Sequence, residues 1–216
     1  MPTVFRLRFP DRGKLEAAAG TIAEGGVTVF PTETVYGIGA DARRPDAMMR
    51  VREVKGKPRD LPLLLHCADE EQALPWVTGF PSAASSLAGR FWPGPLTIVL
   101  AAAGSTPAEV TGSLSTVGIR MVSHPVSAEL IRLLGAPIAG TSANLRGEEP
   151  TGRYADIDPV LLGGTDIAID SGKCGEGTPS TVIDLSQEKA RVLREGAVSL
   201  ELLSEVLGYL PESAAG

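Results

Sequence analysis

A short run of β-branched and aromatic residues gives the first indication of the fold: Val27-Thr28-Val29-Phe30, followed at once by Pro31-Thr32-Glu33-Thr34. The run predicts a buried strand because no charge interrupts it. A helix is expected just before it, and Gly25-Gly26 provides a plausible end for that helix. The residues that share its buried face recur at helical spacing: Leu15, Ala19 and Ile22.

Helical and strand-like patterns alternate along the rest of the chain. Asp46 is expected to cap a helix that Gly56-Lys57-Pro58 ends, and further helices are expected over 127–134 and from Ser199 onward. Strands are expected over 63–65, 97–100, 138–139, 167–169, 181–183 and 191–193. This order predicts an α/β (α+β) fold whose sheet contains both parallel and antiparallel pairs.

The composition is that of an ordinary globular protein. The 216 residues are 43% hydrophobic and 21% charged, which favours one folded domain over 1–210 with a disordered tail at 211–216. No apolar run approaches the roughly 20 residues that cross a bilayer, and the N-terminus lacks the pattern of a secretory signal. We therefore expect no membrane association and a cytoplasmic location. Cys67 and Cys174 lie far apart, so neither a zinc site nor a redox motif is predicted.

The charge is unevenly distributed. The segment from Arg43 to Arg59 contains seven basic residues and two acidic ones, a local charge of +5. Because the net charge of the whole chain is −6, the remaining residues carry −11. We call residues 43–59 the basic island. It has two interpretations, a solvated helix face or an anion site, and charge alone favours the first.

Generic nucleotide-binding motifs are missing. The sequence has no GxxxxGK[ST], and Gly37-Ile38-Gly39 does not extend to GxGxxG. It also has no recognisable Ser/His/Asp or Cys/His motif for covalent catalysis. If the protein uses ATP, it does so with another architecture.

Strand-end segments rich in hydroxyls, glycine and single charges are the most informative feature. Each is weak alone, but they follow one another in a definite order: 30–37, 55–63, 91–97, 118–120, 140–144, 179–183 and 193–196. In this order they resemble the YrdC-like family, whose PTETxYGLG, KxRPxxxPL, FWPGPxT, SxN, PSTV and REG elements occur from Phe30 to Gly196. One departure lies in the second element, where Lys57 stands at a position normally held by arginine.

The resemblance implies the fold and the reaction of the short, single-domain members. The expected fold is an open twisted sheet of mixed parallel and antiparallel strands, flanked by helices, with a basic concave cavity. The expected reaction joins L-threonine, bicarbonate and ATP into threonylcarbamoyl-AMP and pyrophosphate, for threonylcarbamoyladenosine in tRNA. It needs no enzyme nucleophile, so positioning and electrostatics would carry catalysis. Mg²⁺ would arrive bound to the ATP phosphates.

The resemblance also implies roles for individual residues. Lys55 and Lys57 would be catalytic, and the ATP-binding set would be Lys55, Lys57, Arg59, Ser142, Asn144 and Arg194. Arg120 would pair bidentately with the threonine carboxylate, and the threonine-binding set would be Thr32, Tyr36, His66, Arg120 and Ser180. A helix-cap role for Ser142 and a core role for His66 are the competing interpretations, while Phe91 and Trp92 are expected in the core.

Two other functions stay open at this stage. One is a related enzyme that forms a carbamoyl adenylate from carbamoyl phosphate. The other is an RNA-binding or ribosome-assembly module, against which the acidic remainder counts. The expected partners are a downstream threonylcarbamoyl transferase complex and, weakly and with steep salt dependence, tRNA or other RNA.

Overall fold

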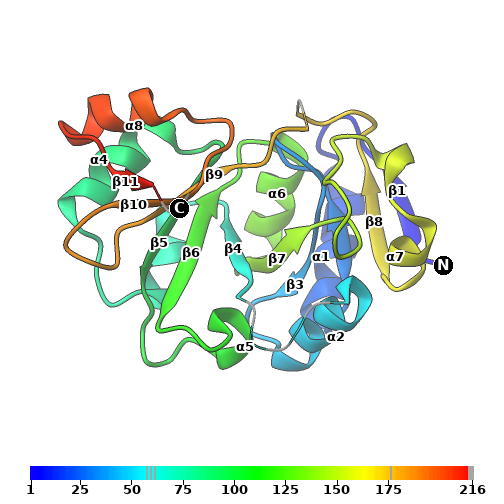
Figure 1. The fold of residues 1–216 in the computed structure, drawn as a ribbon. Coiled ribbons are helices and arrows are strands. Elements are labelled where there is room, and N and C mark those ends of the chain that lie inside the picture. The colour runs from blue at the N-terminus through cyan, green and yellow to red at the C-terminus, as the bar shows by residue number, and fades with distance from the viewer. Residues whose placement is uncertain (57, 59, 61, 176, 214–216) are drawn as a thin grey trace.

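One continuous sheet forms the centre of the protein (Figure 1). The computed structural model describes residues 1–213 apart from 57, 59, 61 and 176. Within them the strand order is β1-β8-β2-β3-β7-β4-β6-β5-β9-β10-β11. The strands are β1 (Thr3–Arg6), β2 (Thr28–Phe30), β3 (Gly37–Asp41), β4 (Leu64–Cys67), β5 (Leu96–Ala101), β6 (Thr116–Met121), β7 (Ile138–Ser142), β8 (Ile167–Asp170), β9 (Thr181–Asp184), β10 (Arg191–Arg194) and β11 (Glu212–Ser213).

Parallel and antiparallel pairs are mixed, as predicted. The parallel pairs are β1/β8, β2/β8, β4/β6, β5/β9 and β10/β11. The antiparallel pairs are β2/β3, β3/β7, β4/β7, β5/β6 and β9/β10. Parallel neighbours such as β4 and β6 are separated by a long crossover, as parallel pairing requires.

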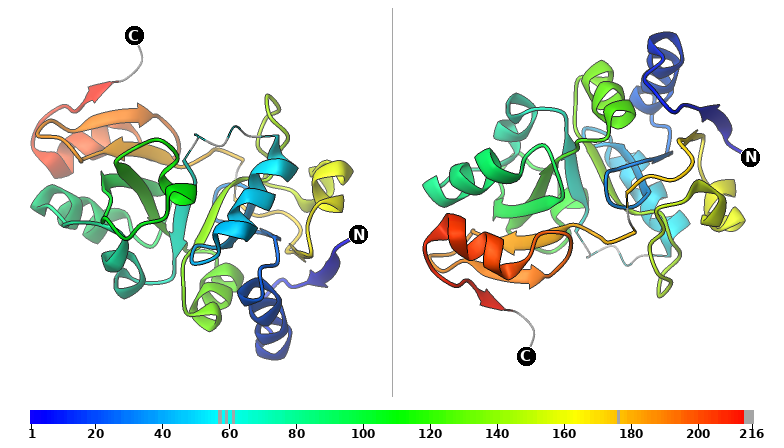
Figure 2. Two further views of the ribbon diagram at one scale, coloured as in Figure 1. Left: turned by 90° about the horizontal axis from the view of Figure 1, so that it is seen from below. Right: turned by 90° about the horizontal axis from the view of Figure 1, so that it is seen from above.

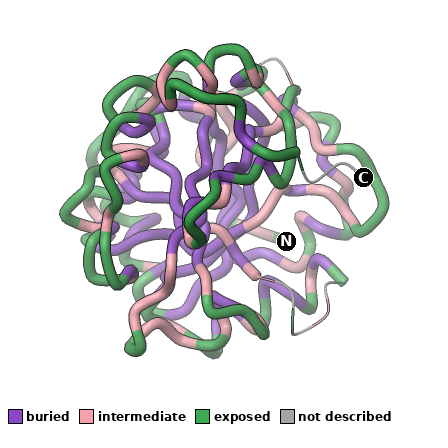
Figure 3. The backbone as a smooth tube through the Cα atoms, turned by 60° about the vertical axis from the view of Figure 1, so that its left-hand side comes forward, coloured by how far each residue is buried: buried purple, intermediate pink, exposed green. Residues whose placement is uncertain are grey.

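Helices cover the sheet in two groups. They are α1 (Arg12–Ala23), α2 (Pro45–Lys55), α3 (Glu70–Ala73), α4 (Ser82–Phe91), α5 (Ala108–Thr111), α6 (Pro125–Leu134), α7 (Pro159–Gly163) and α8 (Leu200–Leu207), with 3₁₀ turns η1 (Leu74–Trp76) and η2 (Tyr154–Asp156). Figure 2 shows α1 and α6 side by side, and they share a smaller apolar core with β8. The larger core includes residues of α2, α4 and α8. The buried strands lie inside a more exposed outer layer (Figure 3).

Alternation along the strands separates the core from the other face of the sheet. On β6, Val117 and Ile119 belong to the larger core, while Gly118 and Arg120 point to the opposite face because successive side chains alternate. The same alternation places core residues Leu65 and Cys67 on β4 and Leu96, Ile98 and Leu100 on β5. Their neighbours His66 and Thr97 therefore face the same side as Arg120.

The predicted strands and helices are present with small shifts of their ends, and two expectations differ. The predicted cap of α2 is wrong: its N-cap is Arg44, whose side chain makes no capping bond, and Asp46 instead forms an ion pair with Arg44. The expected disordered tail also differs at its start, because Glu212 and Ser213 pair with β10 as β11. The residues beyond 213 lie outside the described part, and the single domain over 1–210 stays a prediction.

Much of the basic island is structural. Arg43, Arg44 and Arg50 form ion pairs with Asp41, Asp46 and Asp166 at 2.6, 3.0 and 2.9 Å. These three arginines therefore support the interpretation as a charged surface rather than an anion site.

In the described residues, no helix combines the length and the apolar character that crossing a membrane requires.

Glycines of β3 allow the tight approach of β7, and this generates a stability prediction. A Cβ at Gly39 would lie 2.6 Å from Ile138 Cγ2 and 2.7 Å from the Ala139 carbonyl oxygen. Gly39→Ala should therefore lower the free energy of unfolding by about 1–3 kcal/mol through overpacking. Gly20→Ala is the matched control, because a Cβ there meets no atom within 4 Å. It lies inside α1 and should stabilise by about 0.5–1 kcal/mol. Urea unfolding of both variants checks this, and a Gly39→Ala protein as stable as the wild type would contradict it.

Candidate active site

A cavity opens where the ends of several strands meet. It holds about 460 Å³ of empty space, mouth included. Its lining comes from the ends or flanks of β3, β4, β6, β7, β9 and β10: Thr32, Val35, Tyr36, Gly37, Leu64, His66, Arg120, Thr141, Ser142, Pro150, Pro179, Ser180 and Arg194. Seven of the predicted site residues are in this lining: Thr32, Tyr36, His66, Arg120, Ser142, Ser180 and Arg194. Lys55 and Asn144 lie beside Ser142, and Lys57 and Arg59 fall outside the described residues.

The turn between β2 and β3 has a fixed hydrogen-bond direction. The Thr32 hydroxyl donates to the Val35 carbonyl at 2.6 Å, and it accepts from the Thr34 and Val35 N–H groups. Because the proton of Thr32 is used in this way, the Thr34 hydroxyl must be the donor in the 3.0 Å contact between the two threonines. The hydroxyl of Thr32, expected to bind threonine, is thus engaged in shaping the turn.

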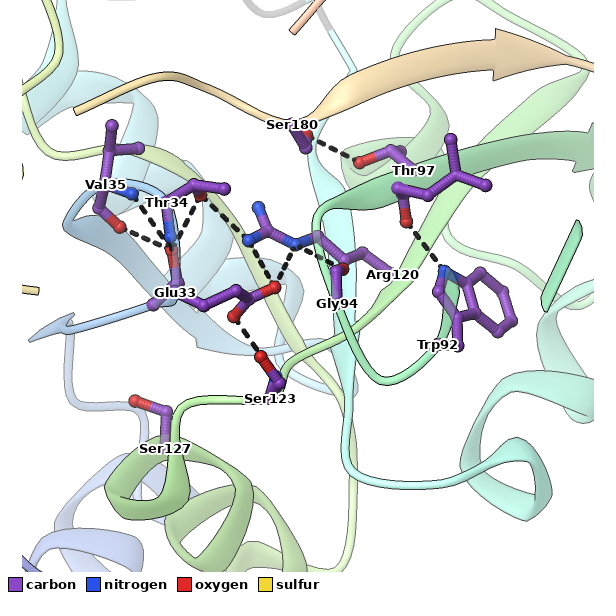
Figure 4. A network of polar contacts seen from close by, with 12 residues as sticks. Glu33, Thr34, Val35, Trp92, Gly94, Thr97, Arg120, Ser123, Ser127 and Ser180 are labelled. Atoms are coloured by element: carbon purple, nitrogen blue, oxygen red, sulfur yellow. Dashed lines mark hydrogen bonds and ion pairs between the residues drawn. The ribbon is translucent and has the colours of Figure 1, made fainter. Parts of the chain in front are cut away.

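Arg120 is held by an acidic residue that the sequence prediction missed. Its Nη2 lies 2.6 Å from Glu33 Oε1 and 2.8 Å from Thr34 Oγ1. Its Nε donates to Glu33 Oε1 at 3.2 Å and to the Gly94 carbonyl at 3.3 Å (Figure 4). The side chain of Arg120 is 4% exposed. The Nε and Nη2 edge, which would form the expected bidentate pair with a substrate carboxylate, is therefore occupied.

His66 provides a neutral acceptor. Its Nδ1 lies 3.3 Å from the Ile138 carbonyl oxygen, which can only accept, so Nδ1 carries the proton. Burial, and next the positive charge of Arg120, lower the pKa of His66 to about 4. The imidazole is therefore neutral at physiological pH, and its Nε2 is left as an acceptor.

Ser180 provides a donor, because its neighbours fix the direction of its proton. The Thr97 hydroxyl is completely buried and lies 2.9 Å from Ser180 Oγ, its one hydrogen-bond partner in the described part of the chain. Thr97 must donate there, or its own proton would be buried without an acceptor. Arg194 Nη2 also donates to Ser180 Oγ, at 3.1 Å. With two donors already aimed at this oxygen, the Ser180 proton is available to an acceptor in the cavity.

Arg194 carries a positive charge without an acidic partner in the described residues. Its Nε and Nη2 donate to the Ser180 carbonyl oxygen at 3.1 and 2.9 Å. Burial, and next the charge of Arg120, lower the pKa of Arg194 below its usual range. The two guanidinium groups therefore repel each other across a space that an anion could occupy.

Lys55 organises the loop after β7. Its Nζ donates to the Ser142 carbonyl at 2.6 Å, to Asn144 Oδ1 at 2.7 Å and to Ser142 Oγ at 3.3 Å. Asn144 Nδ2 donates to the carbonyls of Leu145 and Glu148. The predicted grouping of Lys55 with Ser142 and Asn144 is present, but both amide protons of Asn144 serve the loop, which differs from the expectation that they reach a phosphate.

Aromatic residues near the cavity have structural contacts. The Tyr36 hydroxyl donates to the Gly172 carbonyl and accepts from the Ser171 N–H, so this residue lines the cavity without a spare hydroxyl. Trp92 Nε1 donates to the Leu96 carbonyl at 2.7 Å, and its ring packs near that of Phe80. Trp92 and Phe91 pack against the larger core, as expected.

A protein-held metal ion finds little support in the described residues. They contain no group of three or more His, Cys, Asp or Glu that could bind one. Glu33 is committed to Arg120.

Comparison with known proteins decides the family. A family model described as "Telomere recombination" (Sua5/YciO/YrdC) matches residues 20–196. The chain belongs to this family. A threonylcarbamoyl-AMP synthase from Xanthomonas campestris is 36% identical over 81% of this chain and 95% of its own length. The resemblance inferred from the sequence is thus confirmed.

A longer relative from Pyrococcus abyssi, also named threonylcarbamoyl-AMP synthase, is 42% identical over 91% of this chain. The chain spans 58% of the length of that relative. The crystal structure of P. abyssi Sua5 complexed with L-threonine superposes with a TM-score of 0.92 at 39% identity, covering 99% of this chain and 62% of the other. The YrdC-like fold, with its mixed open sheet, is therefore confirmed as well.

The hydrogen bond between Thr97 and Ser180 can be tested without a ligand. We expect Thr97→Val and Ser180→Ala to show a coupling of about 0.5–1.5 kcal/mol in a double-mutant cycle of unfolding free energies. Thr97→Ser keeps the hydroxyl and should preserve most of the coupling. Additive effects of the two substitutions would contradict the direct bond.

The pKa of His66 generates a pH prediction. The folded-state pKa of about 4 is lower than the usual 6.5, so the neutral ring stabilises the fold above about pH 6.5. This contribution, on the order of 3 kcal/mol, should be lost as the pH falls from about 6.5 to about 4. The difference in unfolding free energy between the wild type and His66→Asn should therefore shrink toward low pH. Curves that stay parallel over this range would show that His66 is not buried as a neutral group.

Proposed function

We propose that the protein is an L-threonylcarbamoyladenylate synthase, a nucleotidyltransferase that forms threonylcarbamoyl-AMP and pyrophosphate from L-threonine, bicarbonate and ATP. The product would serve threonylcarbamoyladenosine formation in tRNA. The observation that carries the proposal is that one cavity combines three groups. They are Arg120 in its ion pair, His66 as a neutral acceptor, and Arg194, which has no acidic partner among the described residues. The names of the relatives and the threonine complex of the P. abyssi protein support it.

The reaction requires two bond-forming steps, and neither needs an enzyme nucleophile. The threonine amine attacks carbon dioxide derived from bicarbonate and loses a proton, which gives a carbamate. A carbamate oxygen then attacks the α-phosphate of ATP, and the bond to the leaving pyrophosphate breaks. The protein lowers the barrier by holding the reactants together and by stabilising charge on the phosphates.

The cavity residues suit these reactants by their hydrogen-bond directions. Arg120 and the Ser180 proton would bind the threonine carboxylate, because both donate. The Nε2 of His66 would accept from the threonine amine or hydroxyl. Tyr36 and the Thr32 turn would form the wall of this subsite without donating a hydroxyl proton.

The phosphates would lie toward Arg194 and Ser142. Arg194 has no carboxylate partner among the described residues, and guanidinium groups bind phosphate strongly. Lys55, proposed as catalytic together with Lys57, would hold the loop that presents Ser142, and Asn144 would act through Lys55. Arg59 belongs to the proposed ATP set, although Lys57 and Arg59 both lie outside the described residues. Mg²⁺ bound to ATP would share the phosphate charge.

The proposed product is a reactive mixed anhydride, so a transferase that consumes it would act nearby in the cytoplasm. Weak RNA binding at this chain stays part of the proposal.

An omission assay tests the proposed function. Pyrophosphate release should require ATP, L-threonine and bicarbonate together, and release that does not depend on threonine would contradict the proposal. Release with carbamoyl phosphate in place of threonine and bicarbonate would favour a carbamoyl-adenylate-forming enzyme instead. RNA binding without any pyrophosphate release would favour an RNA-binding module.

Within this assay, Lys55→Ala should lower the rate by roughly ten- to a hundredfold, because a charge-assisted contact contributes about 1.5–3 kcal/mol. Lys14→Ala is the matched control, since Lys14 lies exposed on α1 and pairs only with Asp11 among the described residues. Wild-type turnover in a folded Lys55→Ala protein would contradict the proposed role of Lys55 in the reaction.

A further inference from the structure

The guanidinium of Arg120 is fixed along one edge, and this leaves a single nitrogen for the cavity. Nε and Nη2 are used by Glu33, Thr34 and the Gly94 carbonyl. Nη1 makes no hydrogen bond to the described residues, and Figure 4 shows it pointing away from Glu33. Because Arg120 lines the cavity, Nη1 is the part of its charge that a ligand can reach.

Glu33 is itself held in place from the strand that carries Arg120. Its Oε2 accepts from the Ser123 N–H at 3.1 Å, and Ser123 lies just beyond the end of β6. The carboxylate thus bridges the turn before β3 and the exit of β6. A carboxylate fixed by donors on both oxygens determines the rotation of the guanidinium that it contacts.

The two arginines of the cavity differ in charge balance. Arg120 pairs with Glu33 at 2.6 Å, and both side chains are largely buried. Arg194 contacts only neutral oxygens among the described residues. The Arg120 end of the cavity is therefore close to neutral overall, whereas the Arg194 end is positive. A neutral end suits a zwitterion, which carries no net charge, and a positive end suits a polyanion.

We propose that Glu33 is a positioning and specificity-determining residue, which rotates Arg120 so that Nη1 faces the cavity and makes that end selective for a zwitterionic amino acid over phosphate. The proposal rests on the proposed function, because it identifies the amino acid as the substrate that meets Arg120. Glu33 acts through Arg120, so it changes which ligand binds without taking part in bond making.

Calorimetric titration of the full chain with L-threonine, and separately with inorganic phosphate, tests this proposal. Glu33→Gln keeps the size of the side chain but removes its charge. We expect the Kd for L-threonine to rise about tenfold and the Kd for phosphate to fall by a similar factor. Thr34→Val removes the Oγ1 acceptor of Nη2, together with the hydrogen bond that Thr34 donates to Thr32, and leaves every charge in place. It should weaken L-threonine by a smaller factor and leave phosphate binding unchanged, because the charge is unaltered.

Asp41→Asn is the matched control, because Asp41 is a buried carboxylate that pairs at the same 2.6 Å with Arg43, an arginine that does not line the cavity. It should leave both dissociation constants unchanged. The proposal is overturned if Glu33→Gln binds both ligands as the wild type does, or if Asp41→Asn or Thr34→Val tightens phosphate binding as strongly as Glu33→Gln. If Glu33→Gln fails to fold, Thr34→Val with wild-type affinity for L-threonine also overturns it. A wild-type protein that does not bind L-threonine would contradict the proposed function itself.

Discussion

The register between β4 and β6 is the constraint on which the site depends. These parallel strands place His66 opposite Arg120, while Leu65 and Ile119 pair on the core side. A slip of one residue would bury Arg120 among apolar side chains and turn core residues toward the cavity. The apolar faces of both strands resist that slip, because they pack in the larger core. The positions of His66 and Arg120 thus follow from the packing of residues that do not line the cavity.

Fixed hydrogen-bond directions then determine which groups of a ligand the cavity residues can bind. A hydroxyl in water can donate or accept, but a buried hydroxyl beside a carbonyl must donate to it. Thr32 is committed in this way to Val35, and Thr97 is committed to Ser180. The cavity therefore offers donors at Arg120, Ser180 and Arg194 and an acceptor at His66, and none of them has to reorient when a ligand binds. Such preorganisation is what a reaction without an enzyme nucleophile needs.

The sequence predicted the elements whose signal is local. Buried strands such as 181–183 and the helix that ends just before Gly25 follow from short-range patterns. The ordered strand-end segments predicted most of the cavity lining. β3 was missed because its glycines, Gly37 and Gly39, are unfavourable in isolated strands. Tertiary contacts explain them, because a Cβ at Gly37 would meet the ring of Phe30 and a Cβ at Gly39 would meet β7. Glu33 was missed as a functional residue although its motif was found, because its partner Arg120 lies 87 positions away and no local pattern identifies such a pair.

The distribution of positive charge explains why only part of the basic island relates to the site. Arg43, Arg44 and Arg50 are neutralised by aspartates, so their charge stabilises the surface and offers little to an anion. Of the island's described residues, Lys55 lies beside the cavity at Ser142, and the arginines that line the cavity, Arg120 and Arg194, lie on separate strands far from the island in sequence. Arg194 keeps its charge although burial and Arg120 both disfavour it. A bound anion would relieve that cost, so the fold of the free protein favours anion binding beside Arg194.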